Sequence, residues 1–465
     1  MVFSSLFFLY CFFPVSIALY LIAPGLRMKN WVLTIMSLVF YAWGEPICVL
    51  LLIVQALVGY AGALIVQEAR DQGKKLALGL TATVILSMLA IFKYADFFLL
   101  NFNLISGLDV PLLGLALPIG ISFFTFQTLS YVIDVYRGQT RAQRFFPDLL
   151  LYVALFPQLI AGPILRYTDI EKQLTHRHAT AKGMYQGLFR FCLGLGKKVL
   201  LANYAGSVAS GLLDGGAACA SDAWLGAALF TFQIYFDFSG YSDMAIGLGR
   251  MFGFTYPENF NLPYIARSIT DFWRRWHISM STFFRDYVYI PLGGNRKHQW
   301  LNMLITWFLT GMWHGASWNF ILWGLYYCLL LCIEKALGER LLGHIPRVLR
   351  HLFTLFFVIL GWMLFYYTDL NQLGATLAAA FGQRGWAGAQ SGILFMNNLP
   401  LLLVCLVGST PLPRLVGQKT QDFCVQRDHL VLLTLLQFLL ILVLLGLATV
   451  SLVGESYNPF LYFRF

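Results

Sequence analysis

The sequence contains few charged residues: Asp, Glu, Lys and Arg together make up only 12% of its 465 positions. Soluble proteins carry about 25% charged residues, so this composition excludes an ordinary water-exposed surface. Hydrophobic residues make up 58% of the chain and gather in runs of about 20, the length that crosses a bilayer as a helix. The sequence therefore predicts an all-α polytopic membrane protein of about 11 helices, because helices satisfy their backbone amides internally.

The sequence also lacks cysteine pairs, long polar stretches and internal repeats. None of its eight cysteines forms a CxxC motif, so we predict neither a disulfide framework nor a metal site. Because no polar stretch could form a soluble domain, residues 1–465 are expected to form a single membrane-embedded domain. Arg27 and Lys29 follow the first apolar run and no basic residue precedes it, which is typical of a retained span rather than a cleaved signal peptide.

Positive charge is in excess, with 32 basic and 22 acidic residues and a net charge of +10. Many of the basic residues lie in short loops, such as Arg70, Lys74 and Lys75. Short basic loops stay on the cytoplasmic side of a membrane, so the excess indicates topology rather than a nucleic-acid partner. The predicted partner of this surface is the lipid bilayer.

The segment 265–300 is both basic and aromatic. Its basic residues are Arg267, Arg274, Arg275, Arg285, Arg296 and Lys297. At helical spacing, Arg274, His277 and Arg285 share a polar stripe beside an apolar stripe of aromatic residues that includes Trp273. We expect an amphipathic helix that lies in the headgroup plane on the cytoplasmic side.

The apolar run 301–334 contains no Lys, Arg or Asp. A single straight helix of this length would measure about 51 Å, well beyond the hydrocarbon thickness of about 30 Å. Gly311 and Gly315 are the natural place for a break. Irregular backbone at membrane depth is tolerated only beside protein or a water-filled cavity, so we predict that His314 faces an internal cavity.

His314 has two interpretations. An ionisable residue inside a membrane indicates function, and histidine titrates near neutral pH, so it could be a general base or acid. It could equally be a neutral residue that donates to a backbone carbonyl. Trp307 and Trp318 are predicted to share its helical face and to wall the imidazole, and with Asn319 they favour a functional role. The spacing alone leaves both interpretations open.

His277 also has two interpretations. Cationic neighbours such as Arg274 and Arg285 would disfavour the imidazolium and keep the ring neutral, as a general base requires. The second interpretation, favoured on the residues alone, is an interfacial histidine among arginines that face lipid headgroups.

Three acidic residues lie inside apolar runs: Asp134, Asp237 and Asp243. They could form the proton relay of a transporter. They could also be structural acceptors that pair with Arg137 or Arg250 and tie helices together. The structural interpretation is favoured.

Several motifs resemble those of a known family. The Trp-His-Gly motif and the residues after it, 313–324, resemble the signature of the membrane-bound O-acyltransferase (MBOAT) family. The segment 272–296 is similar to the alginate O-acetylation (AlgI-type) branch of that family. The same branch is resembled by the opening five residues and by 40–46, 117–127, 156–166 and 457–465. The resemblance covers essentially the whole chain.

The resemblance implies a fold and catalytic residues. It implies a ring of about 11 tilted helices around a central funnel, with interfacial and re-entrant helices. It places the catalytic histidine at His314 and an upstream histidine at His277, both within a catalytic segment at 265–334. The implied enzyme is an O-acyltransferase that moves an acetyl group from a thioester, with acetyl-CoA as donor substrate and no bound cofactor or metal.

The resemblance also implies a substrate site. The phosphates of acetyl-CoA would be drawn from the cytoplasm to a basic cluster, and the pantetheine arm would reach an aromatic cavity. The cluster consists of Arg274, Arg275, Arg285, Arg296 and Lys297. The residues expected to bind substrate are Arg274, Arg275, Arg285, Asp286, Asn295, Arg296, Trp313, Trp318 and Asn319.

The implied setting is the cytoplasmic (inner) membrane of a bacterium. A separate periplasmic acetyltransferase is the expected partner, and it would act on an exopolysaccharide such as alginate, on cellulose or on peptidoglycan. D-alanyl transfer to teichoic acid ranks lower, because the sister branch lacks the extension present at 290–296. A non-enzymatic transporter and an assembly scaffold are competing interpretations, and the absence of an inverted repeat counts against the transporter.

Overall fold

The computed structural model describes residues 1–160, 162–454 and 461. These residues form α-helices, a few short π and 3-10 helices and connecting turns, and no strand occurs among them. The predicted all-α class is therefore confirmed. Of the closing motif at 457–465, only Leu461 lies within the described residues.

The chain forms two compact units. The first comprises Met1–Phe191 and Ser242–Pro257, and the second comprises Cys192–Tyr241 and Glu258–Phe465. Two long helices, α9 (Ala181–Gly196) and α11 (Ala220–Met251), contribute residues to both units. The expectation of one domain over the whole chain stays a prediction.

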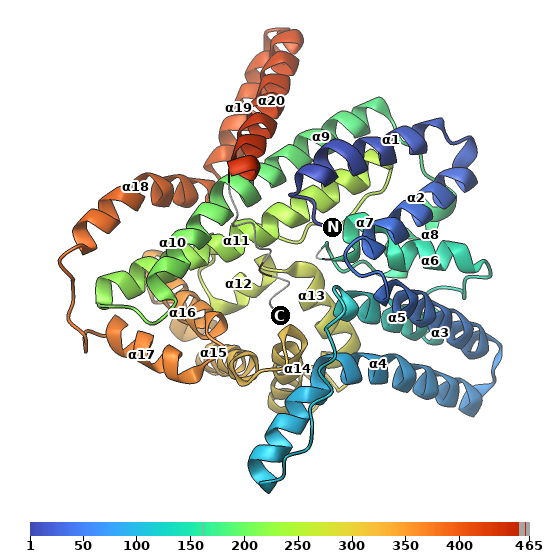
Figure 1. The fold of residues 1–465 in the computed structure, drawn as a ribbon, viewed down its shortest axis with the longest axis horizontal. Coiled ribbons are helices and arrows are strands. Elements are labelled where there is room, and N and C mark those ends of the chain that lie inside the picture. Colours follow the sequence, from blue (N-terminus) through green and yellow to red (C-terminus); the bar gives the residue numbers. More distant parts are fainter. Residues whose placement is uncertain (161, 455–460, 462–465) are drawn as a thin grey trace. The chain divides into compact units, whose positions relative to one another are not determined.

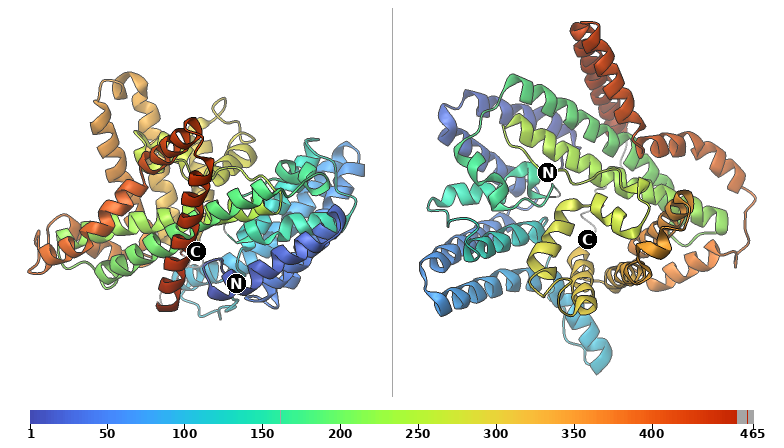
Figure 2. Two further views of the ribbon diagram at one scale, coloured as in Figure 1. Left: turned by 90° about the horizontal axis from the view of Figure 1, so that it is seen from above. Right: turned by 180° about the vertical axis from the view of Figure 1, so that it is seen from behind.

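The first unit is built around phenylalanine rings and close helix contacts. Its other elements are η1 (Phe8–Phe12), α1 (Phe13–Ile22), α2 (Gly25–Ala42), α3 (Cys48–Glu68), α4 (Asp71–Ser106), α5 (Ile121–Tyr136), α6 (Phe146–Ala154), α7 (Phe156–Leu159) and α8 (Tyr167–Thr175). Phe8 packs against Phe40, Phe156 and Phe191. Helix α3 packs against both α4 and α5, and Figures 1 and 2 show these three side by side.

The second unit contains the whole of the predicted catalytic segment, 265–334. Its other elements are η2 (Lys197–Ala202), α10 (Asn203–Leu213), η3 (Pro263–Ile265), α12 (Ile269–Arg275), α13 (Ile278–Phe284), η4 (Arg285–Tyr289), α14 (Gln299–His314), α15 (Trp318–Leu342), α16 (Arg347–Tyr366), α17 (Leu370–Ala380), α18 (Ser391–Gly408), α19 (Leu412–Gln426) and α20 (Leu430–Gly454). Helices α14 and α15 pack along each other, and α16 packs on α15. Helices α19 and α20 form an antiparallel pair (Figures 1 and 2).

Six described helices are long and apolar enough to cross a membrane. They are α3, α4, the Trp318–Gly338 part of α15, α16, α18 and α20. Helix α20 buries little of its surface inside the protein, as expected of a helix that faces lipid. The chain is thus a membrane protein with several apolar helices, while the predicted ring and its funnel stay predictions.

Candidate active site

His314 is the last residue of α14. The helix stops there because Gly315 is extended, at φ −174° and ψ 158°, and α15 begins only at Trp318. The predicted break between Gly311 and Gly315 is confirmed. The His314 side chain is buried, with 8% of its surface exposed. It also sits where the carbonyl ends of α14 point, a position at which positive charge is favoured.

Two glycines allow α14 and α15 to approach closely beside this break. A methyl group at Gly311 would clash with the carbonyl oxygen of Phe320, and one at Gly324 would clash with the carbonyl oxygen of Trp307. Only glycine therefore fits both positions without moving the helices apart. This contact holds the end of α14, and with it His314, against α15.

Aromatic rings surround the His314 imidazole. Its ring centroid lies 4.8 Å from that of Trp323, 4.9 Å from Trp313 and 5.2 Å from Phe365. The prediction that Trp307 walls the imidazole is wrong, because Trp307 packs one layer further out against Trp323 and its neighbours. Besides Trp313 of α14, the wall comes from α15 and α16, which sequence spacing within α14 could not reveal.

Trp318 and Trp307 were predicted to wall the His314 imidazole together, but they have different surroundings. Trp318 opens α15 and is 52% exposed. Trp307 packs against Trp273 at 4.8 Å and stacks with Tyr327 at 5.8 Å. Asn319, also expected in the substrate site, is fully buried and donates from Nδ2 to the carbonyl oxygen of Phe365 at 3.3 Å.

His277 interrupts the segment that was expected to form one amphipathic helix. That prediction is wrong: α12 ends at Arg275, and α13 begins at Ile278. His277 between them has φ +43° and ψ 56°, the left-handed conformation, which an α-helix cannot contain. The turn carries its side chain off the polar stripe of Arg274 and Arg285 and into the protein.

The buried His277 imidazole has polar contact on one side only. Its Nδ1 lies 3.1 Å from Oδ1 of Asn259, and the ring packs edge-on against Phe238 at 4.6 Å. No hydrogen-bond partner lies near Nε2 within the described part of the chain. Burial lowers the pKa of His277 to about 3, because the imidazolium would lose its hydration. The ring is therefore neutral as expected, but burial rather than neighbouring arginines is the cause.

The structure brings the two predicted histidines to one aromatic ring. The Trp313 centroid lies 5.8 Å from that of His277 and 4.9 Å from that of His314. Trp313, which was predicted to be a substrate-binding residue, therefore separates two buried imidazoles that come from different segments.

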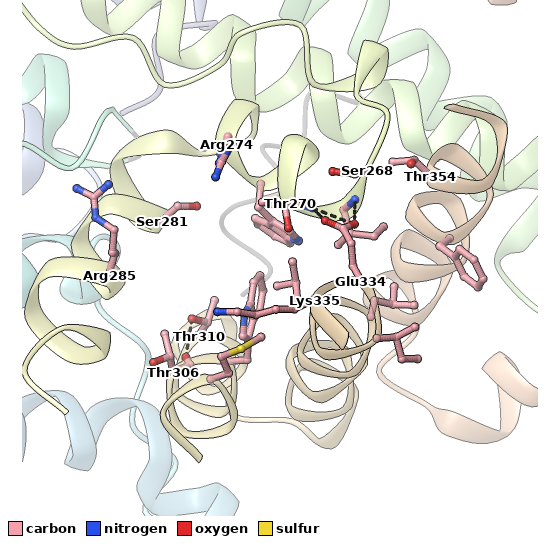
Figure 3. A pocket seen from close by; sticks show the side chains of 18 of the residues that line it. Ser268, Thr270, Arg274, Ser281, Arg285, Thr306, Thr310, Glu334, Lys335 and Thr354 are labelled. Carbon is pink, nitrogen blue, oxygen red and sulfur yellow. Dashed lines mark hydrogen bonds between the residues drawn. The ribbon is translucent and has the colours of Figure 1, made fainter. Parts of the chain in front are cut away.

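A cavity of about 1130 Å³ lies beside this pair and is shown in Figure 3. Trp273 and Ile278, which flank His277 in sequence, line it, and so does Thr310, one turn before His314. Neither imidazole is among the lining residues of the described chain. The two histidines therefore lie behind the wall of this cavity rather than in its open volume.

The lining carries more positive than negative charge. The cationic residues are Arg267, Arg274, Arg285, Lys335 and Arg350. Glu334 is its acidic residue, and its carboxylate accepts from the backbone N–H groups of Ile269 at 2.7 Å and Thr270 at 3.2 Å, as Figure 3 shows. Backbone donors thus compensate the carboxylate and leave the cavity positive.

Only part of the predicted basic cluster lines this cavity. Arg274 and Arg285 do. Arg275 instead pairs with Asp271, at 2.7 Å, and Arg296 is exposed in the turn after η4. The cavity positions of Lys335 and Arg350 could not be predicted from the sequence, because these residues lie on α15 and α16, far from the basic segment.

Two further residues predicted to bind substrate hold neighbouring side chains. Asp286 pairs with Arg285 at 2.6 Å. The Oδ1 atom of Asn295 accepts from Tyr289 at 2.8 Å and from the ammonium of Lys335 at 2.9 Å. Both residues therefore orient cavity cations in this structure.

The acidic residues of the apolar runs bind basic side chains. Asp237 pairs with Lys198 at 2.6 Å, with both side chains buried, and also accepts from the backbone N–H of Leu461 at 2.9 Å. Asp243 pairs with Arg190 at 2.8 Å. The structural interpretation of these two carboxylates is supported, with basic partners that the sequence analysis did not foresee. Within the described residues, no cluster of three His, Cys, Asp or Glu residues could hold a metal ion.

Comparison with known proteins matches this chain to one family. The family model of the membrane-bound O-acyltransferases matches residues 145–374, which include both histidines and the cavity. The probable alginate O-acetylases of Azotobacter vinelandii and Pseudomonas putida are 38% and 40% identical over the full length of both chains. The peptidoglycan O-acetyltransferase of Helicobacter pylori is 36% identical over 83% of this chain and 80% of its own. The chain therefore belongs to the membrane-bound O-acyltransferase family, in its alginate O-acetylation branch, and is a membrane O-acyltransferase.

Proposed function

We propose that this protein takes an acetyl group from cytoplasmic acetyl-CoA and passes it across the cytoplasmic (inner) membrane for O-acetylation of an extracytoplasmic polysaccharide. The similar proteins named for alginate and for peptidoglycan acetylation support this substrate class. Alginate or a similar exopolysaccharide, cellulose and peptidoglycan are the candidate polymers. A separate periplasmic acetyltransferase would complete transfer to the polymer.

The cavity beside the two histidines is the observation that carries the proposal. Its cations are suited to the phosphates of acetyl-CoA, since guanidinium groups bind phosphate through paired, charge-assisted hydrogen bonds. Trp273 and Trp307 give its inner wall an apolar surface for the pantetheine arm. A donor bound in this way would bring its thioester toward His277 and His314.

The chemistry needs a base and a site for the leaving thiol. A hydroxyl oxygen of the acceptor attacks the carbonyl carbon of the thioester, and His314 takes the hydroxyl proton. The carbon–sulfur bond then breaks, and the leaving CoA thiolate takes up the proton from His314. The carbonyl end of α14 would stabilise the imidazolium that forms on His314, by about 0.3–1 kcal/mol.

The direct test is acetyl transfer by purified protein. With radiolabelled acetyl-CoA, we expect wild-type protein to release CoA, and to label an oligosaccharide acceptor when the periplasmic acetyltransferase is supplied. His314→Ala should lower the rate by about 100-fold or more, the usual contribution of general base catalysis. His429→Ala, at an exposed position, serves as the matched control and should keep full activity. Undiminished transfer by His314→Ala would exclude the catalytic role.

The same assay separates the competing functions. The teichoic acid D-alanyltransferase of Bacillus subtilis is 30% identical over only 46% of this chain, so D-alanyl transfer has narrower support. It predicts labelling from a D-alanyl thioester and none from acetyl-CoA. A transporter predicts movement of an acyl group or polymer across vesicles without thioester cleavage. A scaffold predicts that polymer acetylation in cells survives His314→Ala.

A further inference from the structure

Asn259 forms hydrogen bonds with the two residues that follow His277. Its carbonyl oxygen accepts from the N–H of Ile278 at 3.0 Å. Its side-chain Oδ1 accepts from the backbone N–H and the hydroxyl of Ser279, at 3.1 and 2.9 Å. Asn259 is fully buried, so these bonds form away from water. One residue therefore fixes the chain immediately after His277.

These contacts determine which amide atom of Asn259 faces His277. A backbone N–H can only donate, so the atom that receives the bond from Ser279 must be the amide oxygen and not the nitrogen. The same oxygen lies 3.1 Å from Nδ1 of His277. Because an oxygen acceptor faces Nδ1, that nitrogen must carry the ring proton.

The proton on Nδ1 leaves Nε2 with a lone pair. A neutral imidazole has one N–H, so Nε2 of His277 can only accept a hydrogen bond. This nitrogen is buried and has no partner in the described part of the chain. Leaving a buried acceptor unpaired is unfavourable, so we expect Nε2 to receive a hydrogen bond when a molecule with a donor group binds beside it. Trp313 packs beside the His277 ring and also packs against the ring of His314.

We propose that Asn259 is a positioning residue that keeps His277 in the Nδ1–H tautomer, so that Nε2 accepts a hydrogen bond from the hydroxyl of the acyl acceptor. The inference rests on the proposed function, which supplies that hydroxyl. His277 would then orient the acceptor, and His314 would remove its proton. Burial of His277 supports these separate roles of the two histidines, because it keeps the His277 ring neutral.

A pair of substitutions tests which nitrogen of His277 is used. His277→Gln places an amide oxygen near the position of Nε2 and keeps an acceptor there. His277→Asn keeps an amide group near Nδ1 and leaves the Nε2 position empty. We expect kcat to fall about tenfold in His277→Gln and about 100-fold or more in His277→Asn. Equal losses, or the reverse order, would overturn the inference.

The tautomer itself can be observed in the wild-type protein. Nitrogen-15 NMR of histidine-labelled protein in lipid distinguishes protonated from unprotonated ring nitrogens, and the His277→Gln spectrum identifies the His277 signals. We expect the proton on Nδ1, retained in Asn259→Asp, which keeps an oxygen acceptor, and lost in part in Asn259→Ala. A proton on Nε2 in an active wild-type enzyme would overturn the inference and leave the proposed function intact. Absence of acetyl transfer with the expected tautomer would reject the proposed function instead.

Discussion

His277 and His314 carry the same side chain in different surroundings. His277 sits in a left-handed turn, is fully buried and meets the amide of Asn259. His314 ends a 16-residue helix, where the exposed carbonyl groups favour positive charge. Two groups of one type can therefore take different roles in acid–base chemistry, since environment sets their protonation.

Burial of His277 predicts a pH-dependent stability. Its pKa is lowered from 6.5 to about 3 by burial, so the unfolded chain binds a proton that the folded chain excludes. The stabilisation is complete above pH 6.5 and is lost as the pH falls toward 3. At pH 5 the loss is about 2 kcal/mol. Thermal unfolding at pH 7 and pH 5 should show this loss in wild-type protein and not in His277→Gln.

The control for this experiment is the exposed His429. Its replacement by Gln should leave the difference in melting temperature between pH 7 and pH 5 equal to that of the wild type. An equal acid sensitivity of wild type and His277→Gln would show that His277 takes up its proton in the folded protein.

At the scale of helices, the contact between α14 and α15 positions His314, the proposed general base. Gly311 and Gly324 let the two backbones meet, and His314 follows Gly311 by three residues. Two aromatic residues of the wall, Trp323 and Phe365, lie on α15 and α16. The geometry around His314 therefore depends on how closely these helices pack.

Gly324→Ala should disturb this geometry. The added methyl group meets the carbonyl oxygen of Trp307, so the helices must separate, at a cost of about 1–3 kcal/mol. We expect a lower melting temperature and a fall in kcat of about tenfold or more, because small displacements of catalytic groups are costly. Gly446→Ala, in α20 with open space around it, is the matched control and should be neutral or stabilising. Equal behaviour of the two variants would contradict this account.

At the scale of the whole chain, the cavity gathers charges from distant parts of the sequence. Arg274 comes from α12, Lys335 from α15 and Arg350 from α16. Arg275, beside Arg274 in the sequence, pairs with Asp271 and does not line the cavity within the described chain. Two residues that are adjacent in the sequence thus have different surroundings, whereas residues far apart in the sequence line the same cavity.

Two neighbouring arginines provide a test of donor binding. Arg274→Gln should raise KM for acetyl-CoA about tenfold, the value of one charge-assisted hydrogen bond to phosphate, and reduce its dependence on salt. Arg275→Gln should change KM less than about twofold, because its charge is already satisfied by a partly exposed ion pair of little net energy. Steady-state kinetics at low and high ionic strength would measure both, and a larger effect of Arg275→Gln would contradict the assigned site.

Parts of the site could be predicted from sequence where one segment contains all the needed information. The break before α15 followed from a run too long for one span with Gly311 and Gly315 inside it. The continuous helix through His277 was a wrong prediction, because helical spacing cannot show that Asn259 holds the chain in a left-handed turn.

The sequence by itself determined that this chain is a helical membrane O-acyltransferase, and its motifs predicted His314 and His277 as the catalytic residues. Composition, apolar run length and motifs are properties of the linear chain. Only the tertiary structure decided the partners of these residues: Asn259 at His277, Trp323 at His314, and Lys335 among the cavity cations. These contacts join segments that are separate in the sequence. The packing of those segments depends on close approach at a few glycines and on burial, and neither can be predicted from a local sequence pattern.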